Sequence, residues 1–175
     1  MATTTASPVT MAKLMSRHEV AEGTTAFRFE KPSNWTFKSG QYLDITLLDP
    51  SEMDAEGNVR SFSIASAPHE DTLMVATRMR DTAFKRVLNT MPLSSAVKIE
   101  GPSGSLTLHN NVKRTAVFLA GGIGITPFRS VVFHSMQRKR SCLTESSFST
   151  RTAVPRMLRF SMSSRLWNAR IRTTS

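Results

Sequence analysis

Cysteine is nearly absent from this sequence: its 175 residues contain only Cys142. A single cysteine excludes an internal disulfide framework and a cysteine-ligated iron–sulfur cluster within this chain. It is typical of a reducing compartment, so we expect a cytoplasmic location. The four histidines, His18, His69, His109 and His134, are scattered without the spacing of metal ligands, and we predict no metal site.

Long apolar runs and a secretory signal are also missing. No stretch reaches the roughly 20 apolar residues that a membrane-spanning helix needs, and we expect no membrane partner. Residues 1–8 are small and polar, without the basic start and apolar centre of a secretory signal. We expect them to form a frayed tail.

Acidic residues are scarce in one part of the chain only. The formal net charge is +10, and residues 139–175 hold eight of the 23 Lys and Arg but one of the 13 Asp and Glu. The basic character is therefore concentrated in the last fifth of the chain, and it does not indicate nucleic-acid binding by the whole protein. A basic nucleic-acid binder remains the weaker alternative, because this tail has few aromatic rings on which bases could stack.

Between residues 9 and 112 the sequence shows short strands separated by turn residues, a pattern that favours a small antiparallel barrel. Asp81 and Thr82 can cap a short helix over 83–89, which must stop before Pro92. The expected strands are 11–17, 24–30, 42–48, 60–66, 72–79, 96–100 and 105–108.

One of these strands begins with a distinctive motif, Arg60-Ser61-Phe62-Ser63. Strand alternation places Arg60 and Phe62 on one face, and Ser61 and Ser63 on the other. A flat redox cofactor with a pyrophosphate needs a cation, an aromatic ring and a hydroxyl, and arginine offers a planar, permanently charged set of donors. The four residues alone fit an edge strand with a surface Arg and a core Phe better than a cofactor site, because short motifs often match by accident.

A second motif spans residues 115–128 and is predicted to form a strand, a glycine turn and a helix. The turn contains Gly121, Gly122, Ile123 and Gly124; after it, Thr126 is expected as the N-cap and Pro127 as the first helical residue. Glycines allow close approach to a phosphate, and the N–H groups at a helix start attract it. A plain strand-to-helix turn is the alternative.

Together the two motifs resemble those of the ferredoxin–NADP reductase superfamily. The resemblance implies that Arg60 pairs with the FAD pyrophosphate and that Phe62, where tyrosine is commoner, stacks on the isoalloxazine. It also implies that Ser63 acts catalytically near flavin N5. The glycine turn, with Gly121, Gly122, Ile123, Gly124, Thr126 and Pro127, resembles the family's NAD(P)H-binding turn.

Weaker pieces match the same family in the same order. Gly40-Gln41-Tyr42 resembles its signature before a strand and implies that Tyr42 packs beside the flavin, although a tyrosine in the barrel wall is an alternative. Residues 101–104 resemble the turn that closes the flavin barrel. The further residues that the resemblance places in the cofactor site are Ser61, Thr77, Arg78 and Met79.

The resemblance implies a mainly β protein: an antiparallel Greek-key, FAD-binding barrel at 9–112 with one short helix. The first β-turn-α of an NAD(P)H-binding domain follows at 113–138. The implied function is an oxidoreductase that passes electrons from NAD(P)H through FAD to an unidentified acceptor, such as an iron–sulfur or haem protein. A flavin-binding barrel without turnover is the alternative.

After about residue 136 the pattern of alternating strands and helices is lost. Codons can be chosen for 140–174 so that the frame one base earlier encodes an apolar strand, a proline-bearing turn and an acidic amphipathic helix. That is the order a nicotinamide domain requires next. We hypothesise that the chain is truncated or frame-shifted here, and we expect 139–175 to be a poorly packed tail.

Overall fold

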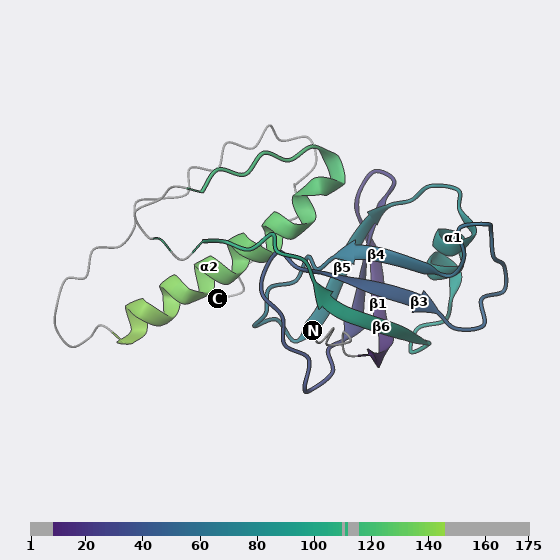
Figure 1. Cartoon of the computed structure of the whole chain (residues 1–175), viewed down its shortest axis with the longest axis horizontal. Helices are drawn as coiled ribbons and strands as arrows, with labels where there is room; N and C mark the ends of the chain where they lie inside the picture. Colours follow the sequence, from purple (N-terminus) through teal and green to yellow (C-terminus); the bar gives the residue numbers. More distant parts are fainter. Residues whose placement is uncertain (1–8, 110, 112–115, 146–175) are drawn as a thin grey trace, which may run out of the picture.

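The computed structural model describes residues 9–109, 111 and 116–145, with side chains described up to 137 (Figure 1). Six strands and one short helix come first, and a one-turn 3-10 helix and a longer helix follow. Their bounds are β1 Val9–Ala21, β2 Thr24–Glu30, β3 Tyr42–Leu47, β4 Val59–Ser63, β5 Thr72–Arg78, α1 Ala83–Thr90, β6 Ala96–Ser103, η1 Gly122–Ile125 and α2 Thr126–Glu145.

The six strands form one antiparallel sheet in the order β4-β3-β6-β1-β2-β5. Neighbours in sequence pair in β1–β2 and β3–β4, whereas β6 returns to lie between β3 and β1, as in a Greek key. The sheet curls until its two ends meet, where the Ala65 amide donates to the Met74 carbonyl at 2.7 Å. The predicted mainly β, antiparallel fold is confirmed.

The strand ends differ from expectation where glycine changes the backbone direction. The strand over 24–30 has the predicted bounds, and β1 and β6 are longer than predicted. The strand expected at 105–108 is not formed. Gly104 has φ +96°, outside the extended region, and it follows directly on the last residue of β6.

Apolar side chains from every strand fill the barrel. Phe27 and Phe29, two residues apart on β2, are 0% and 1% exposed and point into one cluster with Leu14, Leu43 and Ile99. Each fully buried side chain of this size stabilises the fold by about 1.5–3 kcal/mol. This closed interior holds the strand that carries the Arg60 motif in a fixed register.

Helix α1 begins where the sequence indicates, but another residue caps it. Thr82 is the N-cap and makes no side-chain capping hydrogen bond. The Asp54 carboxylate, from the loop between β3 and β4, instead accepts the Ala83 amide at 3.0 Å. The cap expected from Asp81 and Thr82 is thus replaced by Asp54, a residue that reaches the helix only in the folded chain.

The segment 116–120 is not a strand, although the sequence predicted one over 115–120. Val117 is 76% exposed and Leu119 is 87% exposed. A parallel strand takes its hydrogen bonds from neighbouring strands and its cover from helices, and the described residues supply neither for this segment. The predicted N-cap is also displaced, because Thr126 has helical dihedrals and is itself the first residue of α2.

Several expectations concern residues without a described structure. The tail at 1–8 and residues 146–175 lie outside the described residues, whereas 139–145, expected to belong to the tail, continue α2. The domain bounds remain predictions. Among the helices of the described residues, none has the length and apolar character needed to cross a membrane.

Candidate functional site

Two clusters of predicted site residues lie toward opposite ends of β4. Figure 1 shows α1 on one side of the strands and α2 on the other. Arg60 lies at the α1 end, and the chain that continues from Ser63 through Ala65 reaches α2. A strand rises about 3.3 Å per residue, so Arg60 and Ser63 are separated by about 10 Å along it.

The Arg60 guanidinium is held by the loop that precedes β4. Its Nη1 donates to the carbonyl oxygens of Glu56 at 2.9 Å and Val59 at 2.7 Å. Its Nη2 pairs with the carboxylates of Glu56 at 2.6 Å and Asp54 at 3.4 Å, and the group lies over the Phe84 ring. Carboxylates therefore occupy the donors that a phosphate would use.

The N-terminus of α1 lies beside this arginine. The first N–H groups of a helix lack intrahelical partners and carry a partial positive charge. Asp54 takes one of them, at Ala83, while it also contacts Arg60. The Thr82 hydroxyl is buried there and has no hydrogen-bond partner within the described part of the chain. The start of α1, the Arg60 guanidinium and the Thr82 hydroxyl thus lie together, with Asp54 between the helix and the arginine.

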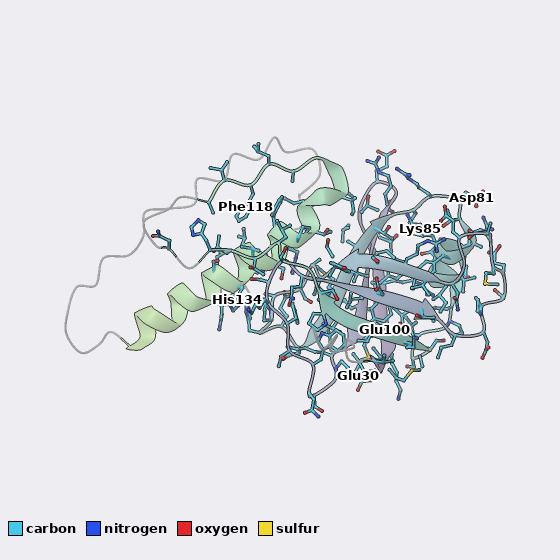
Figure 2. The ribbon with its side chains drawn as sticks, in the orientation of Figure 1. Glu30, Asp81, Lys85, Glu100, Phe118 and His134 are labelled. Carbon is cyan, nitrogen blue, oxygen red and sulfur yellow. The ribbon has the colours of Figure 1, made fainter. Side chains whose placement is uncertain are left out.

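Lys85 adds a further positive charge to this end. Figure 2 shows it on α1, near Asp81. Burial lowers the pKa of Lys85, and repulsion from Arg80 and then Arg60 lowers it further. Its ammonium group donates to the Arg78 carbonyl at 2.7 Å. Lys85 and Arg60 thus lie close enough to repel one another at the α1 end, where the carboxylates of Asp54 and Glu56 also lie.

The predicted alternation along β4 is confirmed. Phe62 and Arg60 both contact Phe84, with ring centroids 5.9 Å apart for the two phenylalanines, so they share the inner side. Ser61 is exposed and donates to the Asp44 carboxylate of β3. Phe62 is only 8% exposed, so its ring packs as a core residue; its stacking on a cofactor remains a prediction.

The exposed aromatic ring beside Ser63 is Tyr42. It pairs in register with Ser63 on one side and Ser103 on the other, and it is 39% exposed. A Cβ atom at Gly104 would lie 2.9 Å from the Tyr42 ring, so the absence of a side chain there makes room for it. Ser63 and Tyr42 are thus cross-strand neighbours, and the Tyr42 ring lies against Gly104 on the β6 side of β3.

A small pocket that is open to solvent lies where the barrel meets the glycine turn. Its barrel wall consists of small and apolar side chains, and two arginines stand at its edges. The lining residues are Val20, Ala21, Thr24, Ala26, Ala65, Met74, Ala76, Arg78, Gly122, Ile123, Ile125, Thr126 and Arg129. Such a wall suits a flat, largely apolar ring better than a charged group.

The glycine turn presents open backbone. A Cβ atom at Gly121 or Gly124 would meet nothing within 4 Å, and at Gly122, where φ is +53°, it would come within 4.0 Å of the Arg78 guanidinium. The Thr126 hydroxyl donates back to the Ile123 carbonyl at 3.0 Å and so closes the turn. The turn is accessible to a phosphate, and Arg78 lies beside it.

Sequence reasoning missed Arg129 and Glu70, which join α2 to the barrel. Arg129 forms a two-pronged ion pair with Glu70, at 2.9 and 3.2 Å, although 59 residues separate them. Burial raises the pKa of Glu70, but hydrogen bonds from Arg129 and the Ala67 amide outweigh it and bring the pKa below 4.5. Neither residue lies in a motif, so only the fold reveals the pair.

The predicted site residues thus fall into four groups. Arg78, Gly122, Ile123 and Thr126 line the pocket, and Gly121 and Gly124 lie exposed in the same glycine turn. Arg60 lies beside the start of α1, and Tyr42, Ser61 and Ser63 lie on the outer side of β3 and β4. The remaining predicted residues are packed inward or partly buried: Phe62, Thr77, Met79 and Pro127.

A family model described as an FAD-binding domain matches residues 9–126. Dual oxidase 2 of Rattus norvegicus is 30% identical over 118 residues, which cover 63% of this chain and 8% of the relative. Methane monooxygenase component C of Methylosinus trichosporium is 35% identical over 98 residues, which cover 55% of this chain and 27% of that protein.

Solved structures share the fold at lower identity. A ferredoxin NADP+ reductase from Neisseria gonorrhoeae with bound FAD and NADP matches with a TM-score of 0.58 and 20% identity, over 75% of this chain and 53% of that one. A flavohemoglobin from Malassezia yamatoensis with bound FAD and heme matches with a TM-score of 0.61 and 21% identity, over 75% and 35%. The chain therefore spans only part of the length of these relatives.

Proposed function

Since this chain belongs to the FAD-binding domain family of ferredoxin reductase type, we propose that it is the flavin-carrying part of an oxidoreductase. In this proposal NAD(P)H is the electron donor and the acceptor is unidentified, with iron–sulfur and haem proteins as the candidate classes. The observation that carries the proposal is the placement of Arg60 beside α1 and of an apolar pocket toward opposite ends of β4. FAD has the matching shape, a pyrophosphate and a flat ring joined by a ribityl chain.

The α1 end suits the pyrophosphate. Arg60 and Lys85 provide charged donors, and the Thr82 hydroxyl has no other partner in the described part of the chain. The Arg60 guanidinium pairs with the carboxylates of Asp54 and Glu56, so a phosphate that binds Arg60 has to displace these carboxylates. A doubly charged group held by helix N–H groups and an arginine fork is a stronger partner than a carboxylate on a surface loop.

The α2 end suits the isoalloxazine. The small side chains of Ala65 and Ala76 leave a flat wall, and Ile123 and Ile125 oppose it. Ser63 lies two residues before Ala65, and its hydroxyl can donate a hydrogen bond at the reactive edge of a ring bound here. When bound, FAD supplies the chemistry of accepting a hydride and releasing electrons; this chain binds it, orients it and shields it from water.

The glycine turn supports NAD(P)H as the donor. Gly121 and Gly124 are exposed, and a side chain at either would meet nothing within 4 Å, which leaves room for a phosphate to approach the turn. One observation favours a second candidate, a flavin-binding chain without turnover. Segment 116–120 forms no strand, and the described residues offer no further strand across which a nicotinamide could lie.

Titration of the purified chain with FAD tests the binding step. We expect Arg60→Ala to weaken FAD binding by about tenfold, because a charge-assisted, two-pronged contact contributes about 1.5–3 kcal/mol. The matched control is Arg86→Ala, an arginine on the exposed side of α1 that pairs with Glu52. An unchanged FAD affinity in Arg60→Ala would remove Arg60 from the site.

Stopped-flow flavin bleaching by NADH and NADPH separates the two candidates. Hydride transfer needs the two rings aligned at about 3–3.5 Å, and orientation contributes about 7–11 kcal/mol to the lowering of the barrier. Losing half of that slows the step by roughly a thousandfold. Fast bleaching supports the oxidoreductase; FAD binding with bleaching slower by that factor than in a complete reductase supports the binding chain.

A further inference from the structure

Arg129, in the first turns of α2, ties that helix to the barrel. Its Nη1 donates to the Ala65 carbonyl at 2.7 Å and to Glu70 Oε2 at 2.9 Å, and its Nη2 donates to Glu70 Oε1 at 3.2 Å. The two side chains are 12% and 21% exposed. Planar guanidinium donors that match a carboxylate fix both distance and orientation.

We call the contacts of Arg129 with Glu70 and with the Ala65 carbonyl the clamp. Neighbouring groups support the clamp from both sides. Ser130, the next residue of α2, donates to the Ser66 carbonyl at 2.6 Å. The Arg129 guanidinium lies over the Phe133 ring, 4.2 Å from its centroid. The Ala67 amide donates to Glu70 and so orients the carboxylate. Arg129 and Ser130, which are consecutive in α2, thus donate hydrogen bonds to the carbonyls of Ala65 and Ser66, which are consecutive in the chain that follows β4.

The clamp acts at the seam that closes the barrel. Ala65 donates to the Met74 carbonyl at 2.7 Å, and the Met74 amide donates to the Ser66 hydroxyl at 3.0 Å. Ala65 and Met74 also form the barrel wall of the pocket, and Arg129 lines it from the opposite side. Arg129 therefore joins α2, which directly follows the glycine turn, to that wall.

We propose that Arg129 is a positioning residue for the ring end of the site: through Glu70 and the Ala65 carbonyl it sets the width of the pocket that receives the isoalloxazine. This inference rests on the proposed FAD binding. Within the described part of the chain, Arg60 contacts its own loop and α1, and none of its contacts is with α2. Loss of Arg129 therefore affects the ring end and leaves the phosphate end intact.

Two ligands distinguish the two ends. FAD occupies both, whereas ADP carries the pyrophosphate and adenosine without the ring. We expect Arg129→Gln to weaken FAD binding by about tenfold and to change ADP binding by less than about twofold, measured by calorimetric titration of the full chain. Arg129→Lys keeps the charge without the fork and should fall between wild type and Arg129→Gln.

A matched control and a second variant keep the test independent of folding. Arg17→Gln removes another partly buried arginine, which donates to the Met91 carbonyl at 2.6 Å and does not line the pocket. It should leave the ratio of FAD to ADP affinity unchanged. Glu70→Gln removes the partner from the barrel side and should reproduce the selective loss of FAD affinity. Circular dichroism establishes that each variant is folded.

The outcomes separate this inference from the proposed function. Equal losses of FAD and ADP affinity in Arg129→Gln, or no loss of either, overturn the positioning role. Wild-type chain that binds neither ligand overturns the proposed function, and the inference falls with it. Bound flavin whose fluorescence is quenched more readily by iodide in Arg129→Gln than in Arg17→Gln supports the wider pocket directly.

Discussion

The barrel and the segment at 116–125 contain similarly apolar sequences and differ in what surrounds them. Phe27 of β2 is 0% exposed within the barrel, whereas Val117 and Leu119 are 76% and 87% exposed. The barrel strands have antiparallel neighbours on both sides or a closing seam, and the described residues give 116–120 none. An apolar run therefore becomes a buried strand only when the chain around it supplies a ladder and a cover.

The largest expected effect contrasts these two environments directly. Phe27→Ala should lower the free energy of unfolding by about 3–5 kcal/mol, because it leaves a cavity in a packed core. Val117→Ala removes an exposed side chain and should change that free energy by less than about 0.5 kcal/mol. Urea unfolding followed by circular dichroism measures both. Similar losses would show that 116–120 is packed in solution.

Glycines sharpen the comparison. Gly40 has φ +97°, and a Cβ atom there would lie 1.9 Å from the Leu106 carbonyl oxygen, whereas Gly121 has φ −112° and nothing within 4 Å. Gly40→Ala should cost about 2–4 kcal/mol from backbone strain and overpacking, and Gly121→Ala less than about 0.5 kcal/mol. The urea midpoints test this pair; a large loss in Gly121→Ala would mean that the turn is covered.

The barrel was largely predictable because its signals are local. Alternation, turn residues and strand propensity placed β2 and the Arg60 motif, since each residue's face follows from its neighbours in sequence. The prediction of a strand at 115–120 was wrong because it assumed neighbouring strands. The apolar pattern of this segment is local, but a strand is stable only when neighbouring strands supply its hydrogen bonds.

The candidate site was predictable in its motifs and not in its contacts. Arg60 and the glycine turn could be found from the sequence, whereas Asp54 at the start of α1 and Glu70 beside Arg129 could not. These carboxylates come from loops 29 and 59 residues away in sequence from the groups they bind. No periodicity encodes such a distance, because it is set by how the barrel closes.

A pH series tests the contact between the two regions. The pKa of Glu70 lies below 4.5, since burial raises it but hydrogen bonds from Arg129 and the Ala67 amide lower it more. Its contribution to stability is therefore complete above its unfolded pKa and is lost as the pH falls through its folded value. We expect wild type to exceed Glu70→Gln in stability by a constant amount above about pH 5.5 and by less as the pH drops below about 4.5.

That difference is read from urea midpoints at each pH. The reverse pattern, in which the advantage of wild type grows as the pH falls from 5.5, would mean that the Glu70 pKa is raised and that burial prevails over Arg129. A pH-independent difference would mean that Glu70 has the same pKa in the folded and unfolded chains, so that Arg129 does not lower it.

The smallest effect is expected for the ion pair most like the clamp in geometry. Arg86 pairs with Glu52 through two prongs, at 2.8 and 2.6 Å, as Arg129 does with Glu70. Its side chain is 46% exposed and that of Glu52 is 40% exposed, against 12% and 21% for the clamp. Water and salt screen exposed charges, and ordering two long side chains offsets most of what the pair gains. We therefore expect Arg86→Gln to leave the urea midpoint unchanged within error at 0.5 M NaCl, whereas Arg129→Gln lowers it at low and high salt alike. Equal shifts of the urea midpoint for the two variants would mean that the paired hydrogen bonds between guanidinium and carboxylate, rather than burial of the pair between barrel and helix, determine how much each ion pair stabilises the fold.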